Sequence, residues 1–244
     1  MLPRWANIRL TSSDEWPDTA TSEYTIWHSL VSSSDRIDMS APLEDIRVID
    51  LTRVLAGPFG STILGDLGAE VIKVEGPGGG DPVRYVAPYH NEQSHYFLSL
   101  NRNKKSIVID VKTEAGRRIL AELVERADVL IENFRPGVLS ELGLNPTDLL
   151  ERQPRLIVCS ISGFGQTGPL RDKASFDLVT QAMSGAMSVT GEPGRPPVRM
   201  GLPLGDLIGG LYGSLAVCAA LHRRNETGQG ELIDMSLFDG LVGL

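Results

Sequence analysis

Asp206 is the residue of this sequence with the clearest chemical potential. It lies in residues 201–210 (GLPLGDLIGG), directly before a long apolar run. One interpretation is structural, because aspartate is a common helix N-cap. A carboxylate near a helix N-terminus is also favoured in its charged form, and it can then attack an activated acyl group. Gly205, Gly209 and Gly210 predict room for a large ligand beside the backbone. Asp206 is therefore a candidate nucleophile.

Residues 132–137 (ENFRPG) follow a predicted strand directly. In open α/β sheets, ligands bind at the carboxyl ends of strands. Asn133 could contact a polar edge of a ligand, Phe134 could stack on a base, and Arg135 could pair with a phosphate. Turn chemistry at a helix start is the other interpretation.

Residues 101–106 (NRNKKS) place three cations in a short turn before a strand. A solvated surface is one interpretation of such a run. The other is a clamp for phosphates, since Arg and Lys form charge-assisted hydrogen bonds with them.

The first predicted strand is followed by residues 55–60 (LAGPFG), which depart from the G-x-G-x-x-G pattern of dinucleotide sites. Pro58 also removes one backbone N–H that a pyrophosphate would use. The sequence therefore argues against a nicotinamide cofactor. A helix N-terminus that faces another anion remains open, as does plain packing.

Hydrolase and metal motifs are absent from the sequence. Neither a serine or cysteine elbow nor an H-E-x-x-H pattern accompanies the histidines, which are His28, His90, His95 and His222. Cys159 and Cys218 have no metal-ligand spacing and form no disulfide framework. We expect no metal and a reducing compartment, the cytoplasm.

Predicted strands and helices alternate along the chain, and this order positions the candidates. Strands are predicted at 46–50, 70–75, 106–111, 128–132, 155–162 and 231–235, and helices at 58–66, 113–127, 136–142, 146–152, 176–187, 207–224 and from near 237. Such alternation predicts an α/β fold with a mostly parallel, Rossmann-like sheet flanked by helices.

Composition narrows the function classes. The 244 residues are 41% apolar and 22% charged, as in a globular protein. A formal net charge of −8 argues against nucleic acid as a partner. The uncharged stretch 207–221 is short for a membrane span and contains three glycines, so we expect a buried helix and no membrane partner.

The two ends of the chain lead to separate expectations. Residues 1–40 are rich in Ser, Thr and acidic residues, which predicts a weakly ordered extension or a misassigned start, with Met39 an alternative start. Residues 41–244 would form the main domain. No stop signal precedes Leu244 in the last predicted helix, which indicates a domain incomplete at its C-terminus.

Taken together, several segments resemble the family III CoA-transferases of the CaiB/BaiF type, which include formyl-CoA transferase, carnitine CoA-transferase and α-methylacyl-CoA racemase. The segments follow the family's order from about residue 42 onward. They are 49–58 (IDLTRVLAGP), 64–75 (LGDLGAEVIKVE), 101–106 (NRNKKS), 132–137 (ENFRPG), 163–169 (GFGQTGP), 205–206 (GD) and 227–231 (TGQGE).

The resemblance implies a CoA-binding large domain whose catalytic aspartate falls on Asp206. Asp206 would attack the acyl-CoA thioester to form an anhydride, then an aspartyl-CoA thioester, from which an acceptor acid takes the CoA. The resemblance also places CoA contacts on Leu55, Ala56, Ile109, Lys112, Asn133, Phe134, Arg135 and Lys173. Gly76 and Glu141 stand where formyl-CoA transferase has arginines that hold CoA. Arg135 with Lys104 or Lys105 could compensate.

Residues 175–177 (SFD) separate two reactions of this family. The racemase branch has a histidine before the aspartate, because moving an α-proton needs two acid/base groups. Phe176 cannot transfer a proton, so the resemblance favours acyl transfer over racemisation. Packing is the other role for Phe176.

The resemblance implies a longer chain with a second, smaller domain, which we expect to be missing from these 244 residues. Full-length members form interlocked homodimers. The sequence therefore leaves three alternatives: a CoA-transferase, a racemase-like proton-transfer enzyme, or an inactive truncated binding fragment. Arg195 and Arg199 could bind the free end of a dicarboxylate, or they are solvated loop residues.

Overall fold

The computed structural model describes residues 40–244. The predicted N-terminal extension, with Met39 as an alternative start, therefore lies outside the described residues except for Ser40.

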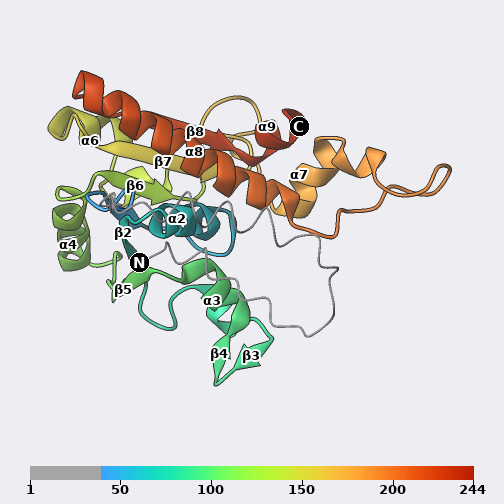
Figure 1. Ribbon diagram of the computed structural model, residues 1–244, viewed down its shortest axis with the longest axis horizontal. Helices are drawn as coiled ribbons and strands as arrows, with labels where there is room; N and C mark the ends of the chain where they lie inside the picture. The colour runs from blue at the N-terminus through green and yellow to red at the C-terminus, as the bar shows by residue number, and fades with distance from the viewer. Residues whose placement is uncertain (1–39) are drawn as a thin grey trace, which may run out of the picture.

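A six-stranded sheet in which every neighbouring pair is parallel forms the centre of the fold (Figure 1). Its strands are β1 (Arg47–Asp50), β2 (Glu70–Glu75), β5 (Lys104–Val108), β6 (Val129–Glu132), β7 (Ile157–Ser162) and β8 (Leu232–Ser236). Their spatial order is β5-β2-β1-β6-β7-β8, the order of a Rossmann sheet. The predicted α/β class and parallel sheet are confirmed.

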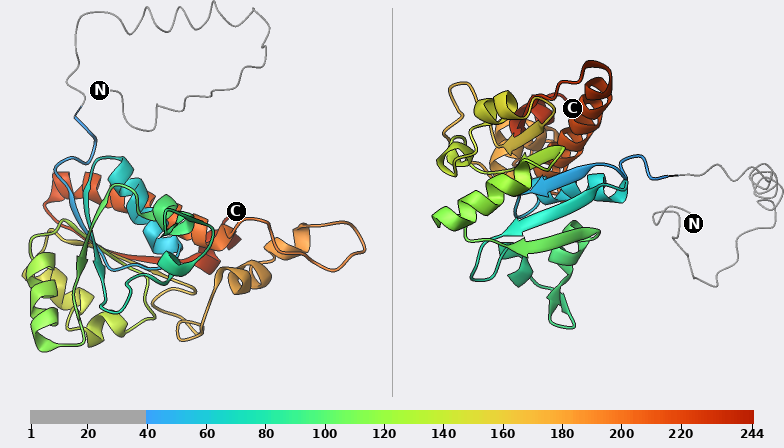
Figure 2. Two further views of the ribbon diagram at one scale, coloured as in Figure 1. Left: turned by 90° about the horizontal axis from the view of Figure 1, so that it is seen from below. Right: turned by 90° about the vertical axis from the view of Figure 1, so that its left-hand side faces the viewer.

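Helices cover both faces of this sheet (Figure 2). One face packs against α2 (Ala56–Asp66) and α8 (Leu204–Thr227). The other face packs against α4 (Glu114–Val124), α5 (Val138–Glu141) and α6 (Pro146–Arg152). All residues of β6 and β7 are buried, as expected for central parallel strands covered on both faces.

Helix α8 is long and apolar enough to cross a membrane by length and composition alone. Half of its most apolar stretch is buried inside the fold, against α2 and the central strands. Packing in the core accounts for this buried half, so the predicted buried helix is confirmed for one side of α8. On another side Leu211 and Leu215 are 50% and 62% exposed.

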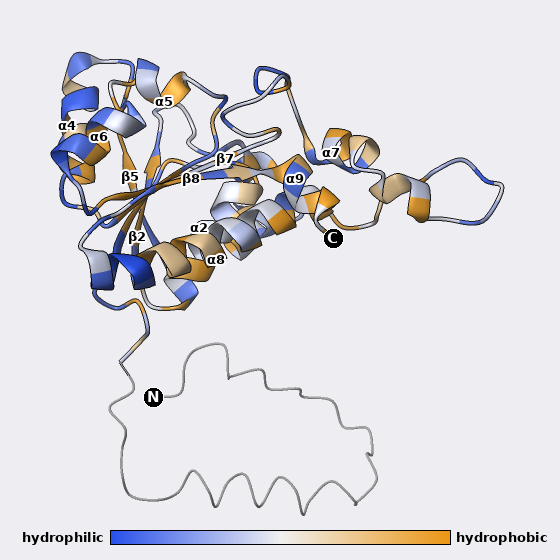
Figure 3. Ribbon diagram, turned by 90° about the horizontal axis from the view of Figure 1, so that it is seen from above, coloured by the Kyte–Doolittle hydropathy of each residue, from blue (hydrophilic) through white to orange (hydrophobic). Residues whose placement is uncertain are grey.

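The glycines around Asp206 serve helix packing, and the predicted space for a ligand is wrong. A Cβ at Gly210 would lie 2.5 Å from the Ala56 carbonyl oxygen, and one at Gly205 would lie 2.5 Å from Thr180 Oγ1. A Cβ at Gly209 would overlap the Leu237 side chain. Protein atoms already fill these spaces. Gly210 lets α8 cross α2 at close range (Figure 3).

Several short elements were not predicted from the sequence. They are the 3₁₀ turn η3 (Pro82–Tyr85), the hairpin of β3 (Tyr89–His90) and β4 (Gln93–Ser94), and α3 (His95–Asn101). Ser94 caps α3 by accepting the Phe97 N–H. The predicted helix 176–187 divides into α7 (Asp177–Met183) and η4 (Ala186–Val189), because Gly185 between them is left-handed with φ 90°.

Helix α7, η4 and the following loop project beyond the sheet as an arm (Figures 1 and 3). The chain then returns through residues 200–203 to the start of α8. The last helix, α9 (Leu237–Val242), follows β8 and contacts both α7 and α8.

Candidate functional site

The site lies between β1 and β6, the point at which the order of the strands in the sheet reverses. The chain leaves β1 toward α2 on one face and leaves β6 toward α5 on the other, so the two loops separate and a crevice opens at the carboxyl ends of the strands. A cleft of about 300 Å³ occupies this position.

This cleft brings together most of the residues that the resemblance singled out. Leu55 and Ala56 line it from the start of α2, and Asp206 lines it from the first turn of α8. The others that line it are Asn133, Phe134, Arg135 and Lys173. Residues separated by up to 151 positions thus share one cavity, and Asp206 faces the ligand crevice of the sheet.

Ile109 and Lys112 line a second cavity, of about 280 Å³, beside the cleft. The two cavities share Arg53 and Phe134. The Arg53 guanidinium lies over the Phe134 ring, 5.7 Å from its centroid. Together the cavities follow the sheet edge from Asp206 to Lys112, a shape suited to an elongated ligand.

Asn133 locks the loop after β6 to the loop after β1. Its Oδ1 accepts the Arg53 N–H at 2.9 Å, and its Nδ2 donates to the Arg53 carbonyl oxygen at 2.8 Å. Both ends of the amide are therefore engaged within the protein. Asn133 thus positions Arg53, and because it also lines the cleft, its contact with a ligand edge stays a prediction.

Asp206 is a residue of the first turn of α8, and the predicted N-cap role is wrong. The N-cap is Pro203, whose side chain caps nothing. Asp177, in α7, takes this role from a distance, because its Oδ1 accepts the Gly205 N–H at 2.8 Å and the Asp206 N–H at 3.4 Å. The Asp206 carboxyl group is thereby left free of helix capping and lines the cleft.

Gln181 holds this arrangement in place. Its Nε2 donates to Asp177 Oδ2 at 2.7 Å and to the Leu202 carbonyl oxygen at 3.1 Å. Its Oε1 accepts the Met200 N–H at 2.9 Å. This fully buried side chain fixes both Asp177 and the segment that leads into α8.

The environment of Asp206 raises the pKa of its carboxyl group. Burial, and then the negative charge of Asp177, raise the pKa of the Asp206 carboxyl group to about 7. The Tyr96 phenol belongs to the same surroundings, since burial and then the charges of Asp206, Asp81 and Asp177 raise its pKa. Tyr96 lies on α3, a helix that the sequence did not predict.

A buried ion pair supports the loop after β1. Lys73 Nζ lies 2.9 Å from Asp81 Oδ2, and both side chains are 1% exposed. Lys73 also donates to the Thr52 carbonyl oxygen at 2.8 Å, and Asp81 accepts the Val54 N–H at 3.2 Å. Val54 has a left-handed φ of 70°, which the pair helps to hold.

The predicted phosphate clamp at residues 101–106 does not reach the cleft. The Lys104 side chain is buried and pairs with Asp50 at 3.1 Å. Lys105 pairs with Glu70 at 2.6 Å, and Arg102 pairs with Asp66. Neither lysine lines the two cavities, so neither compensates for Gly76 and Glu141.

Other cations surround the cleft instead. Arg53, Arg135, Arg171 and Lys173 all line it, and Arg171 was missed by the sequence analysis. Arg195 and Arg199 do not line it, because their loop belongs to the projecting arm. Arg195 lies 3.8 Å from Glu192. Those two arginines are solvated loop residues in this structure.

Phe176 lines the same cleft as Asp206, and the residue is 79% exposed. Packing within the described residues therefore does not account for it. No group of His, Cys, Asp and Glu side chains suited to a metal ion occurs within residues 40–244.

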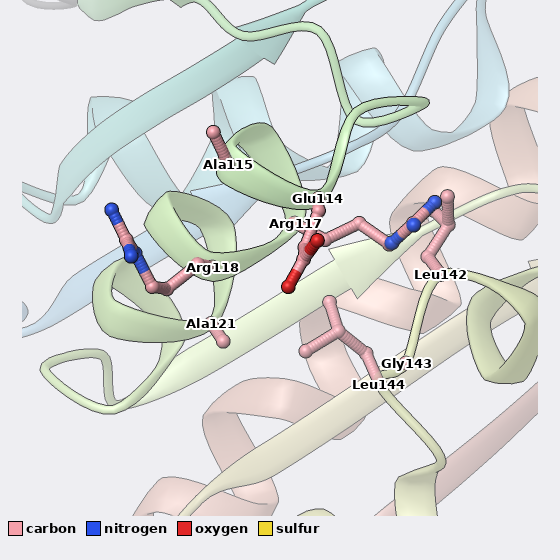
Figure 4. Close-up of a pocket in the computed structure, with 8 residues that line it drawn as sticks. All are labelled: Glu114, Ala115, Arg117, Arg118, Ala121, Leu142, Gly143 and Leu144. Atoms are coloured by element: carbon pink, nitrogen blue, oxygen red, sulfur yellow. The ribbon is translucent and has the colours of Figure 1, made fainter.

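A larger and more open cavity, of about 750 Å³, lies away from Asp206 between α4 and the loop after α5 (Figure 4). Glu114, Arg117 and Arg118 line it, with Leu142 and Leu144 opposite. Arg117 donates to the Lys112 carbonyl oxygen at 3.1 Å. Leu142 also lines the second cavity, so the two meet there.

Comparison with known sequences gives a consistent result. Residues 43–244 match the profile of CoA-transferase family III. The chain is 52% identical over 202 residues to an acetyl-CoA:oxalate CoA-transferase of Acetobacter aceti, covering 82% of this chain and 52% of that protein. It is 50% identical over 206 residues to a succinyl-CoA:glutarate CoA-transferase of Mus musculus, covering 84% and 47%. The chain thus spans about half the length of these relatives.

Solved structures show the same likeness. A CaiB/BaiF family protein from Brucella suis is 44% identical and superimposes with a TM-score of 0.80, covering 84% of this chain and 55% of that one. A hypothetical protein from Mycobacterium tuberculosis is 38% identical with a TM-score of 0.78, covering 84% and 57%.

Proposed function

Because the chain belongs to CoA-transferase family III, we propose that it carries the CoA-binding domain and the nucleophile of an acyl-CoA:carboxylate CoA-transferase. The observation that carries this proposal is the position of Asp206. Its carboxyl group lines a cleft at the switch point of a Rossmann sheet, with four cationic side chains around it.

That position supports covalent transfer through Asp206. The Asp206 carboxylate attacks the thioester carbonyl, the C–S bond breaks, and an anhydride and CoA thiolate result. The thiolate attacks the aspartyl carbonyl, which releases the donor acid and leaves an aspartyl-CoA thioester. The acceptor carboxylate then attacks that thioester to form a second anhydride. The returning thiolate takes the acceptor acyl group and regenerates Asp206.

The raised pKa of Asp206 suits this chemistry. A carboxylate with a pKa near 7 is more basic than an ordinary aspartate, and about half of it is ionised at neutral pH. Since only the ionised form attacks, the rate of exchange should rise with pH through about 7.

The cations of the cleft support binding of anionic ligands. Arg53 lines both cavities and Arg135 lines the cleft next to Phe134, and both side chains suit the phosphates of CoA. Arg171 and Lys173 line the same cleft from the segment that precedes Phe176 in the sequence, and they suit a free carboxylate. Relatives named for oxalate, glutarate and D-citramalate support short dicarboxylic acids as substrates. We expect the full-length protein to be a homodimer.

One other reaction and one inactive form are the alternatives to this proposal. Racemisation needs a second acid/base group beside the nucleophile, and the neighbouring cleft residue is Phe176. An inactive binding fragment would bind CoA without exchanging it.

Trapping tests the proposal. Full-length protein incubated with succinyl-CoA and then hydroxylamine should carry a hydroxamate on Asp206, detected by peptide mass spectrometry. Solvent deuterium in the α-carbon of the acyl group, without exchange of CoA between succinate and glutarate, would instead support racemisation. CoA binding with neither reaction would indicate the binding fragment.

A further inference from the structure

The three cavities described above form one series. The cleft and the second cavity share Arg53 and Phe134, whereas the second cavity and the large open cavity share Leu142. The cleft and the open cavity have no lining residue in common. The second cavity therefore lies between the other two, and the series leads from Asp206 to the open cavity beside α4.

Arg117 lies on α4 at the point where the second cavity meets the open one. Its half-buried side chain extends toward Leu142, whereas the side chain of Arg118 points to the opposite side (Figure 4). Arg117 Nη1 donates to the Lys112 carbonyl oxygen at 3.1 Å, and Lys112 itself lines the second cavity. This hydrogen bond holds the guanidinium beside the loop that borders the second cavity.

Most of the Arg117 guanidinium remains available to a ligand. An arginine side chain has five N–H donors, and the described residues offer those of Arg117 one acceptor, the Lys112 carbonyl oxygen. Neither Arg117 nor Lys112 forms an ion pair within residues 40–244, although Glu114 lines the open cavity too. Two uncompensated positive charges at one place favour an anionic group there.

The rest of the second cavity suits an apolar group between two anionic ones. Its uncharged lining is mostly apolar and includes Ile109, Val111 and Leu120. Its acidic side chains and its buried lysine are held in ion pairs within the protein. Its remaining cations are Arg53, which also lines the cleft, and Lys112, which is bonded to α4.

We propose that Arg117, together with Lys112, binds the 3′-phosphate of CoA and makes the site prefer CoA to 3′-dephospho-CoA. The inference rests on the proposed function. CoA carries a diphosphate on the 5′ oxygen of its adenosine and a single phosphate on the 3′ oxygen. With the thioester at Asp206 and the diphosphate at Arg53, the 3′-phosphate meets the last cations of the series. Guanidinium and ammonium groups both form charge-assisted hydrogen bonds with phosphate.

The test compares two ligands that differ only in the 3′-phosphate. Calorimetry measures the Kd of CoA and of 3′-dephospho-CoA for the full-length wild type, Arg117→Gln and Arg118→Gln. We expect the wild type to prefer CoA about tenfold, and Arg117→Gln to prefer it about twofold or less. Arg118→Gln is the matched control, since Arg118 is exposed and lies 3.9 Å from Glu122. It should keep the wild-type preference.

Arg117→Lys provides a second variant, which keeps the charge but loses the fork of donors, and it should retain part of the preference. An arginine that only supports the fold would weaken the binding of both ligands equally when replaced, which leaves their ratio unchanged. That result, a wild type without preference, or an equal loss in Arg118→Gln would overturn the inference and leave the proposed function intact. A wild-type protein that binds neither ligand would overturn the proposed function itself.

Discussion

The two halves of the sheet's carboxyl edge differ in whether their buried carboxylates form ion pairs. On the β1–β2–β5 side, each buried acid has a cation: Asp50 has Lys104, Asp81 has Lys73, and Glu75 has Arg84 at 2.6 Å. On the β6–β7–β8 side, Glu132 and Asp206 form no ion pair within the described part of the chain, although the cleft that Asp206 lines also contains four cationic side chains.

Their proton affinities differ accordingly. Burial raises the pKa of Glu75, but Arg84, Ser106 and the Asp81 N–H outweigh it and hold that pKa at about 2. The pKa values of Glu132 and Asp206 are both about 7. The first half is a permanently charged support that fixes the loop after β1. The second half changes charge near neutral pH, where chemistry needs it.

The largest effect should come from Asp206, the proposed nucleophile. Asp206→Asn keeps the shape of the side chain and removes its ability to attack a thioester. We expect exchange between succinyl-CoA and glutarate to fall at least about 10³-fold, on the order of 4 kcal/mol in the barrier. Asp45→Asn, an exposed acid remote from the cleft, serves as the control. An Asp206→Asn rate above a tenth of wild type would contradict the covalent route.

Removing an ion pair from the β1–β2–β5 side should chiefly lower the free energy of unfolding. Lys73→Met leaves Asp81 buried without its cation, and we expect the free energy of unfolding to fall by about 3–5 kcal/mol. Lys105→Met, which breaks an exposed pair with Glu70, should cost less than about 1 kcal/mol. Urea unfolding measures both. Similar losses in the two variants would show that burial of the Lys73 pair has no energetic consequence.

On the β6–β7–β8 side, removing a buried carboxyl group should instead raise the free energy of unfolding. The folded-state pKa of Asp206 lies above its unfolded value, so ionisation opposes folding, and stability falls as pH rises from about 4 to 7 and stays lower above. Asp206→Asn should therefore stabilise the protein at pH 8 by about 1–2 kcal/mol, and by much less at pH 5. Thermal unfolding at the two pH values checks this, and a loss of stability at pH 8 would argue against it.

The smallest effect concerns Asp177. Asp177→Asn retains the acceptor for the Gly205 N–H but removes a charge that raises the pKa of Asp206. The acid limb of the profile of kcat against pH should move to lower pH, by up to about one unit. An unchanged limb would mean that burial alone sets the Asp206 pKa.

The sequence predicted what depends on local pattern. The bounds of β2 and α6 are as predicted, since β-branched alternation marks the first and Asn145-Pro146 the start of the second. Helix α3 was missed because it is short and only Leu100 of it is buried. Motif resemblance brought Asp206 and Phe134 into the same candidate site.

Local sequence patterns could not predict contacts between distant segments of the chain. Nothing near Lys104 in the sequence shows that its side chain turns inward to Asp50, 54 residues away. Equally, the capping of α8 by Asp177 depends on how α7 folds back. The residue types could be read in both cases, but the charge balance that decides their role exists only after folding.

The close crossing of α2 and α8 fixes the distance between the two helices that border the cleft. Gly60 lies one turn after Ala56, and Gly210 lies one turn after Asp206, and a Cβ at Gly60 would come within 2.9 Å of the Gly210 carbonyl oxygen. Backbone meets backbone here, so no side-chain exchange can adjust the spacing. The distance between the first turns of α2 and α8 therefore depends on these two glycines, whereas the residues at the rim of the cleft are free to change.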